Sequence, residues 1–114
     1  MRSEPQRVLE LLAAGDERAL GTVMSPTPGA PTGELTVDAL DRRTRALIRL
    51  AALLVLGAPT ASVLWAVELA SATGADVETL TGVLLAAAPA AGTAQLSESA
   101  PRLALALGFD LGLE

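Results

Sequence analysis

The sequence predicts an all-α protein built from helices of moderate length. Residues 40–92 are rich in alanine and leucine and contain long uncharged runs, which are punctuated by Gly57, Gly74 and Gly92. No segment alternates apolar and polar residues as a half-buried strand would. At 114 residues the chain has the size of one domain. We divide it into an N-terminal helix with a Pro/Gly-rich arm, residues 1–39, and a helical core, residues 40–114.

The N-terminal segment is expected to hold a short amphipathic helix over residues 6–14, stopped near Gly15. Its apolar face consists of Val8, Leu11 and Leu12. Residues 16–23 are expected to continue for another turn or two. The stretch 25–33 contains three prolines and two glycines, which neither a helix nor a central strand sustains. We therefore expect an exposed loop there.

The first core helix is expected to begin after Asp41, whose carboxylate can accept hydrogen bonds from the amides of the first turn. Residues 46–56 are apolar except at Arg49. A helix that is apolar on all sides is buried on all sides, so more of this chain or another copy should surround it. Gly57 suits the position just after the helix, and Pro59 can begin the next one.

The second core helix is expected to run from about Pro59 to Thr73 and to end at Gly74. Asp76 then caps a third helix, with Glu78 at the positive end of its dipole.

Two prolines limit the helices that follow. The third helix is expected to reach about Ala88, where Pro89 bends or ends it. A fourth helix starts within residues 93–100, and Pro101 is compatible with it only if a helix starts close by. The candidate caps for that start are Ser97 and Ser99.

The composition excludes several classes of chemistry. The chain contains no Cys and no His, and all eight basic residues are Arg. It therefore lacks a thiol for redox or nucleophilic catalysis, an imidazole for a His-based triad or a zinc site, and a lysine for a Schiff base or a Walker-type phosphate loop. A net charge of −5 with one Trp and one Phe argues against nucleic acid as a partner. We expect no metal and no cofactor.

We expect a cytoplasmic protein that associates with itself. The first residues contain no apolar signal-peptide core. The long uncharged runs are interrupted by the Gly-Ala-Pro at 57–59 and by Pro89 and Gly92, so we expect no membrane span. Apolar residues make up 51% of the chain, more than a lone domain of this size hides easily. Homo-oligomerisation would bury the surplus.

Four short motifs follow one another in an order typical of one protein family. They are Leu-Asp-Arg-Arg-Thr-Arg at 40–45, Thr-Gly-Ala at 73–75, Asp-Val-Glu-Thr-Leu at 76–80 and Ala-Pro-Ala-Ala-Gly at 88–92. Together they resemble the carboxymuconolactone decarboxylase family, which includes the alkylhydroperoxidase D-like thiol peroxidases. The resemblance covers about residues 40–107. It implies an all-α fold assembled as a homo-trimer or homo-hexamer.

The same resemblance implies that the family's catalytic groups are missing here. The redox branch carries a Glu followed by Cys-x-x-Cys-x-x-x-His. Counting back from Gly74 gives the positions of this chain that correspond to those four residues. They are Ala46, Pro59, Ser62 and Ala66. The decarboxylase branch lacks the cysteines but usually keeps the His, whose place is again Ala66. Thiol peroxidase activity is rejected because the chain has no Cys.

Helical geometry selects candidates for a binding site. The side of the second core helix that would face a family-type pocket is nearly apolar. It carries Pro59, Ser62, Ala66, Ala70 and Thr73. On the first core helix, Arg45 and Arg49 lie four residues apart beside Ala46. The ligand-binding candidates are Arg49, Arg45, Ser62, Ala66 and Trp65.

Each polar or aromatic candidate has a structural alternative. Arg49 either forms an ion pair, within the chain or across a subunit interface, or receives a ligand carboxylate in bidentate fashion. Arg45 matches the decarboxylase branch but lies near a helix start, where it can simply be solvated. Ser62 has no base to activate it. Trp65 packs at a core or subunit contact, or stacks on a ligand.

Three functions remain open. The favoured one is a family member without a redox centre that binds a small apolar or carboxylate-bearing molecule with little or no turnover. The second is a true cofactor-free decarboxylase or isomerase of a lactone or keto acid, in which Arg stabilises the carbanion; it needs a proton donor, and no acidic residue is convincingly placed for that role. The third is a structural or interaction oligomer without a small-molecule site.

Overall fold

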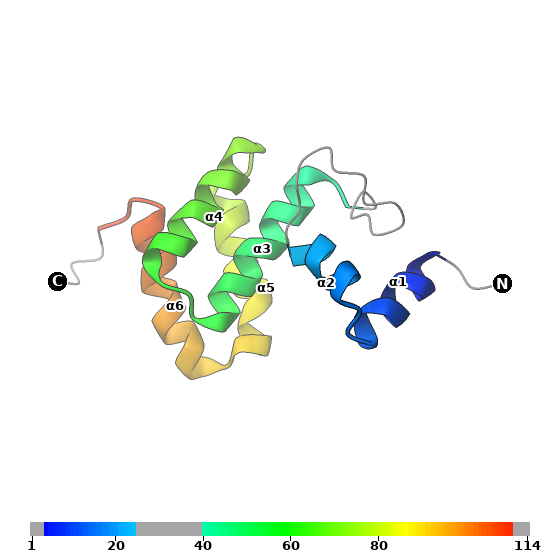
Figure 1. The fold of residues 1–114 in the computed structure, drawn as a ribbon. Helices are drawn as coiled ribbons and strands as arrows, with labels where there is room; N and C mark the ends of the chain where they lie inside the picture. The colour runs from blue at the N-terminus through cyan, green and yellow to red at the C-terminus, as the bar shows by residue number, and fades with distance from the viewer. Residues whose placement is uncertain (1–3, 25–39, 111–114) are drawn as a thin grey trace. The chain divides into compact units, whose positions relative to one another are not determined.

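The computed structural model describes residues 4–24 and 40–110 (Figure 1). Over these residues the chain forms six α-helices and no strand, which confirms the predicted all-α class. The helices are α1 (Glu4–Ala13), α2 (Glu17–Met24), α3 (Arg42–Leu56), α4 (Thr60–Ala72), α5 (Val77–Ala91) and α6 (Thr93–Ala106). The chain divides into two compact units, Met1–Ala39 and Leu40–Glu114. The predicted loop at 25–33 lies outside the described residues.

The N-terminal unit contains α1 and α2, which pack against each other. Gly15 follows α1 with φ 72°, a left-handed conformation that glycine adopts without steric cost. There the Asp16 N–H donates to the Leu11 carbonyl at 3.1 Å. The Asp16 carboxylate then caps α2 by accepting from the Ala19 N–H at 2.8 Å. The predicted extra turn over residues 16–23 is therefore a separate, capped helix.

In the larger unit, α3 begins and ends at the residues that the sequence marks. The Asp41 carboxylate accepts from the Thr44 N–H at 2.7 Å. At the other end Gly57 has φ 73°, and the Ala58 N–H donates to the Leu53 carbonyl at 3.0 Å. This is the Schellman motif, in which N–H groups beyond the helix donate to carbonyls that have no partner within it. The predicted cap and the predicted stop are confirmed.

The turn between α4 and α5 uses the same devices. Gly74 has φ 92°, and the Ala75 N–H donates to the Ala70 carbonyl at 3.3 Å. The Asp76 carboxylate caps α5 by accepting from the Thr79 N–H at 2.8 Å. Ala75 is buried, so the turn is anchored in the core.

Helices α3 to α6 form a four-helix arrangement (Figure 1). α3 packs against α4 and α5, and α6 packs against the same two helices, while α3 and α6 also meet across the centre. The connections between consecutive helices are short, so the chain reverses direction at each one. This topology places α3 and α4 side by side. None of the described helices combines the length and apolar character needed to cross a membrane.

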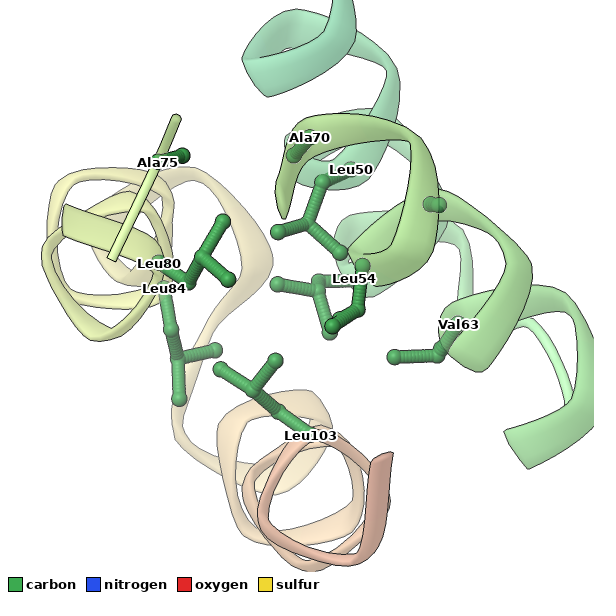
Figure 2. Packing of buried hydrophobic residues seen from close by; sticks show 10 residues of the cluster. Leu50, Leu54, Val63, Ala70, Ala75, Leu80, Leu84 and Leu103 are labelled. Carbon is green, nitrogen blue, oxygen red and sulfur yellow. The ribbon is translucent and has the colours of Figure 1, made fainter. Parts of the chain in front are cut away.

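Aliphatic side chains from all four helices of this unit form one core (Figure 2). Its buried members are Leu50, Leu54, Val63, Ala66, Val67, Ala70, Ala75, Leu80, Leu84 and Leu103. In Figure 2, Leu50 and Leu54 of α3 face the leucines of α5 and α6. Burying a leucine side chain fully stabilises a fold by about 1.5–3 kcal/mol. The core therefore fixes the faces that α3 and α4 turn outward.

Two prolines lie within helices and end neither of them. α5 continues past Pro89, and α6 runs through Pro101 as one helix. A proline removes the hydrogen bond to the carbonyl four residues earlier, here those of Leu85 and Ser97. Both of these residues are exposed, so water can bind their carbonyls. The third core helix, expected to reach about Ala88, ends at Ala91. The fourth begins at Thr93, within the expected range 93–100, but its N-cap is Gly92 and the expected caps Ser97 and Ser99 are wrong.

Ser99 instead joins α6 to the C-terminal end of α3. Its hydroxyl donates to the Leu54 carbonyl at 2.6 Å and accepts from Gln95 Nε2 at 2.9 Å. Arg102 donates from Nη1 to the Gly57 carbonyl at 2.9 Å. A cation is favourable at a helix C-terminus because the helix dipole is negative there. We call Gln95, Ser99 and Arg102 the α6 clamp.

Candidate functional site

Four of the chain's eight arginines lie in the first half of α3. A rotation of 100° per residue places Arg42, Arg45 and Arg49 on one side of this helix. Arg43 lies on another side, where its Nη2 donates to Thr79 Oγ1 of α5 at 3.4 Å. Arg42 and Arg49 are exposed and Arg45 is half-buried. Arg42, Arg45 and Arg49 therefore form a row along α3, which we call the arginine row. Arg43 does not belong to it.

The row is not explained by local helix stability. No ion pair joins Arg42, Arg45 or Arg49 to a carboxylate within the described parts of the chain. The first turn of α3 contains no acidic residue, although the positive end of a helix dipole favours acids over bases. Only the capping carboxylate of Asp41 offsets this. A hydrogen bond from the Thr44 N–H lowers the pKa of Asp41 most, and the nearby arginines lower it further.

Arg49 stacks on Trp65, the single tryptophan of the chain. The guanidinium carbon of Arg49 lies 5.8 Å from the centroid of the Trp65 ring, and half of the Trp65 surface is exposed. A cation–π contact at an exposed site contributes about 0.5–1 kcal/mol. It orients the guanidinium while leaving N–H groups open to solvent. Arg49 is thus an oriented, exposed cation rather than the cation on a buried helix that the sequence predicts.

An apolar stripe runs along α3 next to the arginine row. Ile48, Ala52 and Leu56 follow one another at four-residue intervals, and all three are exposed. The exposed fraction is 52% for Ile48 and 79% for Leu56. α3 is therefore not buried on all sides by the described chain, as its composition led us to expect. We define the α3–α4 surface by its members Arg42, Arg45, Ile48, Arg49 and Trp65.

The five predicted site residues separate into two groups. Arg45, Arg49 and Trp65 belong to the α3–α4 surface. Ala66 is only 1% exposed and belongs to the core, and Ser62 on the same helix is half-buried. The helix side that was expected to line a pocket thus places its Ala66 among the leucines of the core.

The α3–α4 surface has the chemistry of anion binding rather than of proton transfer. Arginine cannot be deprotonated in proteins, so the row provides donors and positive charge only. Asp41 and Asp76 are occupied as helix caps. Hydrogen bonding to Thr79, through its side chain first and its backbone N–H second, lowers the pKa of Asp76, and both carboxylates are thus ionised near neutral pH. Within the described ranges, no three acidic side chains gather into a potential metal site.

Arg42 and Ile48 are the members of this surface that the sequence-based selection missed. The spacing of Arg42, Arg45 and Arg49 at i, i+3 and i+7 was available in the sequence. It could have identified the row before the structure did. The exposure of Ile48 could not be predicted in that way, because α3 reads as apolar on nearly every side.

The chain was compared with protein-family models, with curated proteins and with solved structures, and no match was found in any of the three.

Proposed function

We propose that this protein is a binding protein that takes up a small, carboxylate-bearing, largely apolar molecule at the α3–α4 surface, with little or no turnover. The observation that carries the proposal is the contact between Arg49 and Trp65. It combines an oriented guanidinium, free of any carboxylate partner in the described chain, with a half-exposed aromatic ring.

The two groups suit the two ends of such a ligand. A guanidinium binds a carboxylate through two parallel N–H···O bonds, which fixes both position and orientation. Trp65 offers the adjacent apolar area, since about half of its surface is exposed. Arg45 lies one turn from Arg49 and adds a second positive charge to the same side of α3. Ala66 and Ser62 have no part in this version of the site.

The proposed scaffold is that of a carboxymuconolactone decarboxylase-like protein without a redox centre. The support is the order of the motifs at 40–45, 73–75, 76–80 and 88–92, together with helix caps at Asp41 and Asp76 and glycine stops after α3 and α4. On this proposal the protein is cytoplasmic and works as a homo-trimer or homo-hexamer.

Thermal unfolding in the presence of small acids tests the binding proposal. A ligand present at ten times its Kd stabilises a protein by about 1.4 kcal/mol. Aromatic and aliphatic carboxylates, lactone acids and keto acids should raise the Tm, whereas their amides should not. Arg49→Gln should abolish the rise. Arg43→Gln is the matched control, because it removes the same charge from the same helix on the side that faces α5. Equal responses of the two variants would refute the proposal.

A second candidate function is that of a self-associating structural or interaction module. The observation that favours it is the exposed stripe of Ile48, Ala52 and Leu56 along α3. Large exposed apolar side chains at the centre of an interface contribute most of its affinity. Leu56→Glu should shift the mass measured by light scattering toward the monomer, and Leu85→Glu serves as the control, since Leu85 is 65% exposed on α5. A monomeric wild-type protein would remove this candidate.

A further inference from the structure

We propose that the arginine row of the α3–α4 surface docks an acidic amphipathic helix of a partner protein. The inference rests on the proposed function in one respect, namely that this surface binds carboxylates. It goes further by naming a protein segment as their source.

The guanidinium groups of the arginine row are spaced like side chains along a partner helix. A rise of 1.5 Å per residue puts about 4.5 Å between Arg42 and Arg45 along the axis and about 6 Å between Arg45 and Arg49. The row therefore extends over about 10 Å. One carboxylate can occupy only one of these guanidiniums in bidentate geometry. A second helix repeats the same rises, so acidic residues at i, i+3 or i+4, and i+7 would match the whole row.

Two exposed apolar side chains accompany the arginine row. Ile48 lies about one turn from Arg45 on α3, and Trp65 lies against Arg49. Both side chains are about half exposed. A helix with an acidic stripe and an adjoining apolar stripe would cover charges and apolar area together, as amphipathic helices do in other helix-in-groove complexes.

The row is complementary in charge to an acidic partner. The chain carries a net charge of −5, yet four of its arginines lie within α3, three of them in one row. Such a local reversal of charge steers an acidic partner to one place and repels it from the remainder of the surface. A long polyanion such as a nucleic acid would meet that acidic remainder, which favours a short acidic segment as the occupant.

Fluorescence anisotropy of labelled peptides on the full chain tests the proposal. The first peptide is a helix of about five turns with Glu at the matching positions and Leu beside them. The second has the same composition, with Glu distributed around the helix. The first should bind about tenfold more tightly than the second, and raised salt should weaken it. Arg42→Gln and Arg45→Gln should each weaken it about two- to fivefold. Arg43→Gln should leave it unchanged, and circular dichroism should confirm that every variant is folded.

The contradicting results are distinct for the two proposals. Equal affinity for the two peptides, an unchanged affinity in Arg42→Gln, or stronger competition by an oligonucleotide than by the unlabelled peptide would each overturn the acidic-helix partner. If benzoate nevertheless raises the Tm of the wild type and not that of Arg49→Gln, the small-molecule proposal stands alone. If neither peptide nor benzoate gives an Arg49-dependent response, both proposals fail.

Discussion

Replacing Ala66 by His restores the residue type that the family resemblance implies for this place, and the structure predicts that the protein will not accept it. Ala66 is 1% exposed and belongs to the core of α3 to α6. Adding a larger side chain to a packed core costs about 1–3 kcal/mol. Burying a polar ring without a hydrogen-bond partner costs about 1–3 kcal/mol more. We therefore expect Ala66→His to lose about 2–6 kcal/mol of the free energy of unfolding.

The loss should also depend on pH in a definite direction. Burial disfavours the charged imidazole, so the pKa of the introduced His should lie below that of the same residue in the unfolded chain. Above the unfolded value of about 6.5 neither state binds the proton. As the pH falls through about 6.5, the unfolded state binds a proton that the folded state does not, and the variant should become still less stable.

Chemical denaturation at neutral and mildly acidic pH measures both effects. The matched control is Ala61→His, because Ala61 is exposed on the same helix and should change stability by no more than about 0.5 kcal/mol. Equal stability of the two variants would mean that α4 leaves room beside Ala66 for an imidazole. The assignment of Ala66 to a packed core would then be wrong, and a family-type pocket would return as a candidate site.

Further predictions concern the devices that hold the four-helix unit together. Ser99→Ala should lower the free energy of unfolding by about 1–3 kcal/mol, because it removes the buried hydroxyl that bonds to the Leu54 carbonyl and to Gln95. In the same denaturant titration, Ser97→Ala should be nearly neutral, because Ser97 is exposed. Gly57→Ala should lower the free energy of unfolding by about 1–2 kcal/mol, because φ is 73° there and an added Cβ would lie 2.9 Å from the side-chain nitrogen Nε2 of Gln95. An unchanged Tm would contradict that geometry. The lowered pKa values of Asp41 and Asp76 stabilise the fold above the ordinary aspartate pKa, and this contribution is lost as the pH falls below about 4. Thermal melts should therefore show a smaller acid loss in the Asp41→Asn, Asp76→Asn double variant than in the wild type.

Local signals predicted the helix boundaries well because the interactions that set them are local. Asp41, Asp76 and Gly57 act within a few residues of their own positions, and each does so as expected. Ser99 could not be assigned from the sequence, because its acceptor, the Leu54 carbonyl, is 45 residues away. Pro101 was expected close to a helix start, at a cap of Ser97 or Ser99, whereas α6 begins at Thr93 and continues through Pro101.

The candidate site was predicted only in part, for a related physical reason. Periodicity identifies which side chains share a face of one helix, and it places Arg45 and Arg49 on the same face of α3. It does not say which face of an almost uniformly apolar helix turns outward. Ala66 and Trp65 are neighbours in sequence, yet one is buried and the other half-exposed. The packing of α4 against α3 and α6 decides this.

We propose, centrally, that Arg49 and Trp65 form a carboxylate-binding pair. Trp65 is the only tryptophan and lies against Arg49, so its emission reports directly on this place. Titration with benzoate should change the emission in a saturable way, equally in the wild type and in Arg43→Gln, and the change should vanish in Arg49→Gln. An emission that stays constant throughout, or that responds equally in Arg49→Gln, would contradict the claim.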